Sequence, residues 1–150
     1  MKTILTLGTL SLLLAATTAT SAFAADGRYE GSGTLEVQGR EAVRCDRVSL
    51  DVSEDAYSIY IRQFEFTCDD DTHATMEPRR FEVRGRDIYF NNERVGYRAP
   101  GNTNIEIREY GTGTVLGLNF REDYYNTVDV TQELTAPNFA QRLRASLRRY

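Results

Sequence analysis

The two cysteines are the residues of this chain whose types and spacing indicate a defined chemistry. Cys45 and Cys68 lie 23 positions apart, and the sequence has no Cys-x-x-Cys motif. This motif is typical of redox-active thiols, and its absence argues against catalytic thiol chemistry. An even pair of cysteines behind a secretory leader instead predicts a structural disulfide, Cys45–Cys68, formed in an oxidising compartment.

Acidic residues directly after Cys68 form the second stretch that could do chemistry. The run Asp69-Asp70-Asp71-Thr72-His73 contains the sole histidine of the chain. A calcium loop needs oxygen ligands at alternate positions and a glycine at its sharp turn, whereas these three carboxylates are adjacent. We interpret the run as a solvated loop. No other spacing marks out a catalytic pair, so we expect no metal, no cofactor, no catalytic residue and no enzyme activity.

Aromatic side chains form the third set, and their chemistry is that of an apolar lining. Seven rings are expected to face inward from the strands described below: Tyr29, Tyr57, Phe64, Phe66, Phe81, Phe90 and Tyr97. Such a set is what a small-molecule site requires, and it is also what an ordinary hydrophobic core requires. The sequence leaves core and cavity open, and these rings are the candidate ligand-binding residues.

The N-terminal residues predict export. Lys2 precedes an apolar run over 4–16, and a small polar stretch leads to the triplet Ala22-Phe23-Ala24. This order is typical of a secretory signal peptide over residues 1–24. The apolar run is shorter than a membrane-spanning helix requires, and no later segment is apolar enough to span a bilayer. We therefore expect a soluble mature protein without a transmembrane segment, with residues 25–150 as a single β domain.

Charge restricts the class of partner. Lys2 is the only lysine, so the 126 residues after position 24 carry 17 arginines against 22 acidic residues, a formal net charge of −5. Phosphate binding needs a net basic footprint, so nucleic acid is disfavoured as a partner.

The cysteines require a strand pair to position them. Apolar residues alternate over 43–52 and again over 57–68, and the polar residues between these runs predict the turn of a hairpin. A regular hairpin would place Cys45 opposite Phe64. The alternation of apolar and polar residues shifts by one position between Cys45 and Val48 and again between Ile61 and Phe64. A bulge at each of these places would make the cysteines near-diagonal neighbours.

The rest of the chain also predicts strands. Residues 27–37 alternate strictly, with glycines at two inward positions that leave room for close packing against the backbone. Further strands are expected over 80–86, 104–110, 114–120 and 124–134, and a hairpin over 87–97 turns at Asn91-Asn92. The segment 139–149 fits a strand or a short helix, and we favour the strand because the sheet needs a partner for its last edge.

About nine or ten short strands joined by tight turns predict an all-β antiparallel meander, closed as a barrel or folded as a sandwich. Gly27-x-Tyr29 at the head of the first strand, sequential hairpins and the arginines of the final strand, Arg148 and Arg149, resemble the lipocalin and calycin barrels. The first strand of that family usually carries Gly-x-Trp, and this chain has no tryptophan. The resemblance implies a calycin-like β-barrel.

The leading hypothesis is a secreted, periplasmic, non-enzymatic protein that binds a small, largely hydrophobic ligand inside a β-barrel. The alternative is a protein–protein interaction module, such as a secreted inhibitor or an envelope-associated factor. Its contact surface would be the arginine-rich stretch of Arg79, Arg80, Arg84 and Arg86, because arginine is favoured at interfaces. Those arginines lie among acidic residues, as they also would on a solvated face.

Overall fold

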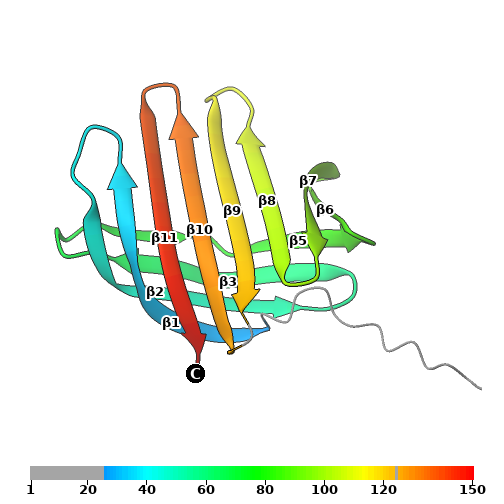
Figure 1. The fold of residues 1–150 in the computed structure, drawn as a ribbon. Coiled ribbons are helices and arrows are strands. Elements are labelled where there is room, and N and C mark those ends of the chain that lie inside the picture. Colours follow the sequence, from blue (N-terminus) through cyan, green and yellow to red (C-terminus); the bar gives the residue numbers. More distant parts are fainter. Residues whose placement is uncertain (1–25, 124) are drawn as a thin grey trace, which may run out of the picture.

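The computed structural model describes residues 26–123 and 125–150, and this part of the chain consists of antiparallel strands and turns (Figure 1). The signal peptide predicted over 1–24 lies outside the described residues. The strands are β1 (Gly27–Val37), β2 (Val43–Glu54), β3 (Ser58–Thr67), β4 (His73–Met76), β5 (Arg79–Arg84), β6 (Asp87–Phe90), β7 (Glu93–Ala99), β8 (Asn102–Glu109), β9 (Thr114–Asp123), β10 (Thr127–Ala136) and β11 (Phe139–Arg149).

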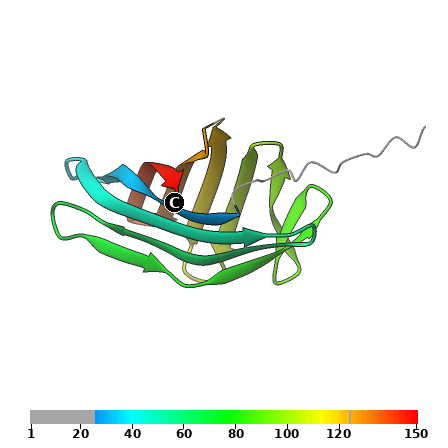
Figure 2. The ribbon, with the colours of Figure 1, turned by 90° about the horizontal axis from the view of Figure 1, so that it is seen from below.

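The strands close into a barrel. Their order in the sheet is β2-β1-β11-β10-β9-β8-β7-β6-β5-β3-β4, and an additional pairing of β2 with β3 joins the two ends. Only β4 stands outside the ring, since it pairs with β3 alone. Strands β8 to β11 cross β2, β3 and β5 at a steep angle, which gives the barrel a flattened shape (Figures 1 and 2). The all-β barrel prediction is confirmed over the sandwich.

The cysteine hairpin forms as the sequence predicts, and register shifts occur at both predicted places, although only one of them lies in the pairing of β2 with β3. The β2–β3 register passes from Asp51↔Gln63 to Val52↔Ile61, so β3 contains one extra residue there. On the other side of β2, the pairing with β1 shifts between Gly31 and Gly33. The predicted disulfide is present, because Cys45 and Cys68 are joined with an S–S distance of 1.99 Å.

The C-terminal segment is a strand, and the helix alternative is wrong. β11 lies between β1 and β10 and pairs with both along most of its length. Leu143, Ala145 and Leu147 face the buried interior, while Arg144 and Ser146 between them face solvent. The first strand needs its glycines here, because a Cβ at Gly33 would lie 2.5 Å from the carbonyl oxygen of Arg144. The extended form is favoured because both neighbouring strands then gain a hydrogen-bonding partner.

The interior is a packed core over much of its length. The largest fully buried side chains include four rings, Phe64, Phe66, Phe81 and Phe120. Aliphatic residues of every strand of the ring complete this core. The contribution of β7 is Val95, which is 9 % exposed. Burial of apolar surface contributes roughly 25 cal/mol per Å² to the free energy of folding. The core therefore supplies the rigid support on which the remaining, unfilled part of the barrel is built.

Candidate functional site

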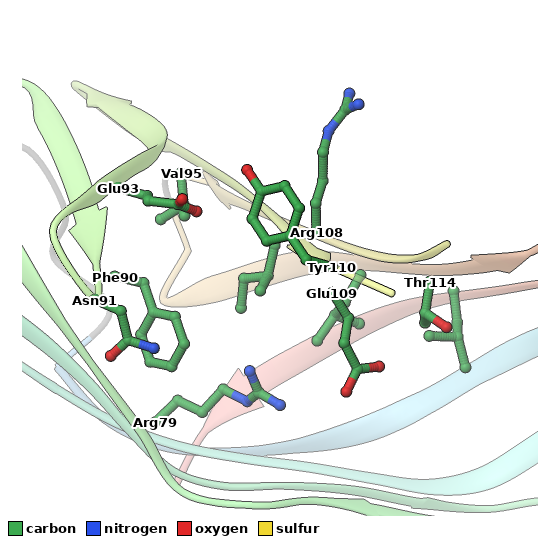
Figure 3. Close-up of a pocket in the computed structure, with 12 residues that line it drawn as sticks. Arg79, Phe90, Asn91, Glu93, Val95, Arg108, Glu109, Tyr110 and Thr114 are labelled. Atoms are coloured by element: carbon green, nitrogen blue, oxygen red, sulfur yellow. The ribbon is translucent and has the colours of Figure 1, made fainter. Parts of the chain in front are cut away.

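A cavity of about 610 Å³ lies at the end of the barrel where β5, β7, β9 and β11 begin, which we call the open end (Figure 3). Its wall comes from β5 to β10 and the turns between them. The lining residues are Arg79, Phe90, Asn91, Glu93, Val95, Ile107, Arg108, Glu109, Tyr110, Thr114, Leu116 and Leu134. The volume falls within the range of roughly 300–1,000 Å³ that is usual for small-molecule sites.

The inner surface of the cavity is apolar. Val95, Ile107, Leu116 and Leu134 come from four strands, β7 to β10, and each faces the barrel interior. The Phe90 ring lies against the Phe81 ring, with 5.5 Å between their centroids, so the cavity ends on the packed core. An apolar ligand body would bury favourably against these four side chains, and the polar side chains of the lining would remain available for its polar groups.

The side chain of Arg79 enters the cavity from β5. Arg79 begins β5, and strand alternation places it on the same face as the buried Phe81 and Val83. Its guanidinium carbon lies 5.6 Å from the centroid of the Phe90 ring, which is a cation–π contact. The Arg79 Nε is buried without a hydrogen-bond partner, and Arg79 makes no ion pair within residues 26–123 and 125–150. The cavity thus contains a guanidinium held by stacking alone.

The other charges belong to the rim. Arg108 is exposed, and its Nε and Nη2 donate hydrogen bonds of 2.9 and 2.7 Å to the carboxylate of Glu106 on the outer face of β8. The Glu109 carboxylate accepts a hydrogen bond of 3.1 Å from the hydroxyl of Thr112 in the β8–β9 turn. Figure 3 shows Arg79 and Glu109 extending into the cavity from different sides. Because Glu109 and Glu93 are exposed, water screens their charges.

The wall of the cavity is incompletely paired between two strands, β7 and β8. β7 and β8 pair only from Gly96↔Ile105 to Ala99↔Asn102, whereas β8 continues its pairing with β9 as far as Glu109↔Thr114. Residues 93–95 and 106–109 therefore border a gap, which we call the β7–β8 gap. An outer groove of about 320 Å³ shares Glu93, Val95, Arg108 and Tyr110 with the cavity. The cavity and the outer groove thus lie on the two sides of this gap.

The opposite end, which we call the closed end, is sealed by a buried ion pair. Arg98 Nη1 donates to Glu54 Oε1 at 2.5 Å, and the two side chains are 11 % and 3 % exposed. Arg98 also donates to the carbonyl oxygens of Ala56 and Gly85, at 3.2 and 3.4 Å. Burial raises the pKa of Glu54 to about 7, and the Arg98 charge and hydrogen bond oppose this shift only in part. The ion pair thus joins the end of β2 to β7 at the closed end.

The predicted ring residues fall into three places. Phe90 lines the cavity, while Tyr29, Phe64, Phe66 and Phe81 belong to the packed core. Tyr57 and Tyr97 are exposed by 78 % and 43 %, so their predicted inward orientation is wrong.

Local backbone geometry explains both exposed tyrosines. Tyr57 lies in the β2–β3 turn, where the Asp55 carboxylate accepts hydrogen bonds of 2.7 Å from the backbone amides of Tyr57 and Ser58. For Tyr97, the β6–β7 register shifts between Ile88 and Tyr89. This bulge reverses the side-chain phase of β7, so that Val95 and Arg98 turn inward and Tyr97 turns outward.

Sequence reasoning missed most of the cavity. Ile107, Leu116 and Leu134 were assigned to strands but not to a site, and their alternation with polar neighbours was the available signal. Arg79 was grouped with the exposed Arg80 and was expected on an outer face. The short strand β4 was also missed, because the run 69–73 was interpreted as a loop and His73 begins this strand.

The described residues show neither a metal site nor a membrane-spanning helix. Among residues 26–123 and 125–150, no three or more His, Cys, Asp or Glu side chains gather where a metal ion could be held. The same ranges contain no helix that is long and apolar enough to cross a membrane.

Comparisons with known proteins do not assign a family. No family model matches the chain, and no curated protein sequence matches it. A solved structure described as EF1p2_mFAP2b bound to DFHBI is similar, with 12 % sequence identity and a TM-score of 0.49. The aligned region covers 83 % of this chain and 93 % of that chain.

Proposed function

We propose that this protein is a secreted, periplasmic binding protein that holds a small, largely hydrophobic ligand in the open-end cavity and catalyses no reaction. The observation that carries the proposal is the cavity itself, which is set into a closed barrel, lined by aliphatic side chains and backed by a rigid core. Rigid, preformed apolar cavities bind ligands without the cost of ordering the site.

Secretion is supported by two independent features. Residues 1–24 have the composition of a signal peptide. The Cys45–Cys68 disulfide joins two strands of the barrel, and such bonds persist in oxidising compartments.

The protein–protein alternative has weaker support from the arginine-rich stretch. Arg84 donates hydrogen bonds of 2.8 and 2.9 Å to Glu82 and lies 4.4 Å from the ring centroid of Tyr89. Arg80 lies over the ring of Tyr60, and Arg79 faces the interior. Arg80 and Arg84 thus already have partners within the barrel, so a protein partner would have to compete with them.

The test is a fluorescence titration with N-phenyl-1-naphthylamine, an uncharged probe that brightens in apolar surroundings. The chain has no tryptophan, so background emission is low. We expect saturable binding to the wild-type protein and weaker binding to Leu116→Trp and Leu134→Trp, which narrow the cavity. Val115→Trp, on the opposite face of β9 from Leu116, is the matched control and should bind like the wild type. Absence of saturable binding, or equal binding by all four proteins at equal folded fraction, would contradict the proposal.

A further inference from the structure

We infer that the ligand carries a carboxylate and that Arg79 binds it inside the open-end cavity. This inference rests on the proposed function and adds the chemical class of the ligand. It starts from Arg79, whose side chain enters the cavity and whose buried Nε has no hydrogen-bond partner.

The polar atoms of Arg79 lack partners. Its Nε is buried without a hydrogen bond, and no ion pair connects Arg79 to the residues that the structure describes. A buried donor without an acceptor destabilises the folded state, and the cost is larger when the group is charged. Other arginines on the barrel, such as Arg62, Arg84 and Arg94, each bond a neighbouring carboxylate. A ligand acceptor would therefore complete an interaction that the barrel itself leaves open.

The Phe90 ring orients this guanidinium. The cation–π contact at 5.6 Å holds the planar group against the cavity wall and restricts its rotamers. A guanidinium presents two parallel N–H donors along an edge, and this spacing matches the two oxygens of a carboxylate. Because Arg79 is positioned before binding, little side-chain entropy is lost when the pair forms.

The charges around the cavity favour a single negative charge on the ligand. The guanidinium of Arg108 is bonded to Glu106, and Glu93 and Glu109 add two carboxylates at the rim. One unpaired cation then faces the ligand, with acidic groups at the entrance. The single charge of Arg79 neutralises one carboxylate, whereas a doubly charged phosphate monoester would retain an excess negative charge inside the cavity. The apolar inner surface would hold the remainder of such an acid.

The test compares 2-naphthoic acid with 2-naphthamide, which have nearly the same shape and differ in charge at neutral pH. Each is used to displace N-phenyl-1-naphthylamine from the wild-type protein. We expect the acid to bind about 10- to 100-fold more tightly than the amide, as a charge-assisted hydrogen-bond pair implies. In Arg79→Gln the advantage of the acid should be lost.

Arg80→Gln is the matched control, since it removes the same charge one residue away on the outer face of β5. It should retain the preference for the acid. Equal affinities of acid and amide for the wild-type protein would overturn the inference without any variant. Retention of the preference in folded Arg79→Gln would also overturn it. In both cases binding of the neutral probe would leave the proposed function standing, whereas loss of probe binding itself would contradict the proposed function.

Discussion

Replacing Glu54 with glutamine should remove a pH dependence from the stability of the barrel. Burial at the closed end raises the pKa of Glu54 from 4.5 to about 7 in the folded protein. The folded state therefore holds this proton more tightly than the unfolded state does. The contribution of Glu54 to stability is fully present below pH 4.5 and is lost as the pH rises through about 7.

The size of the effect follows from the shift. One pKa unit corresponds to about 1.4 kcal/mol, so the wild-type protein should lose up to about 3 kcal/mol above pH 8 relative to pH 4. Glutamine resembles the protonated glutamate in shape and charge. Glu54→Gln should therefore match the wild type near pH 4.5 and exceed its stability by up to about 3 kcal/mol at pH 8.5.

The assay is urea unfolding followed by far-ultraviolet circular dichroism at pH 4.5, 6.5 and 8.5, with the disulfide kept oxidised. Glu82→Gln is the matched control, because Glu82 is exposed and its Arg84 partner lowers its pKa. The contribution of Glu82 to stability is present above pH 4.5 and is lost on acidification. Between pH 6.5 and 8.5 the free energy of unfolding of Glu82→Gln should therefore change with pH as that of the wild type does. Equal destabilisation of Glu54→Gln at all three pH values would refute the reasoning. It would show that the ion pair between Arg98 and Glu54 outweighs the cost of burying the Glu54 carboxylate.

Three further predictions concern the barrel itself. Thr103 is fully buried and its hydroxyl has no partner, so Thr103→Val should raise the free energy of unfolding by about 1 kcal/mol in urea denaturation; a loss of stability would contradict this. A Cβ at Gly96 would overlap the carbonyl of Asn104, so Gly96→Ala should disrupt the β7–β8 pairing. Hydrogen exchange of the β7 and β8 amides should then be faster, and unchanged exchange would show that this pairing does not require a glycine. Cys45→Ser should lower stability by about 3 kcal/mol in the same denaturation assay, and unchanged stability of the variant would exclude a stabilising disulfide.

Much of the fold could be predicted because the decisive signals are local. Asn91 and Asn92 adopt positive φ angles of 51° and 65°, which is the geometry that the hairpin reading requires. The two phase slips around the cysteines are real bulges, because a half-buried sheet cannot tolerate an apolar side chain on its solvent face. These features are set within a few residues of the chain.

The site could not be predicted in the same way, because it depends on contacts between distant strands. The bulge in β7 carries no mark in its sequence, and it decides that Val95 rather than Tyr97 faces the cavity. Arg79 and Arg80 are adjacent and alike, and the register of β5 alone places one inside and one outside. Ile107, Leu116 and Leu134 are cross-strand neighbours on one wall of the cavity, and the residues that line the cavity with them, such as Arg79 and Phe90, come from β5 and β6, which no single strand reveals.

The central claim is that the open end of the barrel binds a small apolar acid, and a nuclear magnetic resonance titration tests it most directly. Amide and methyl resonances of the ¹³C,¹⁵N-labelled protein would be followed while 2-naphthoic acid is added. We predict saturating shifts at Arg79, Phe90, Ile107, Leu116 and Leu134, with little change at Glu54 and Arg98 in the closed end. Shifts spread over the outer surface, or no saturable shift in the cavity residues, would contradict the account.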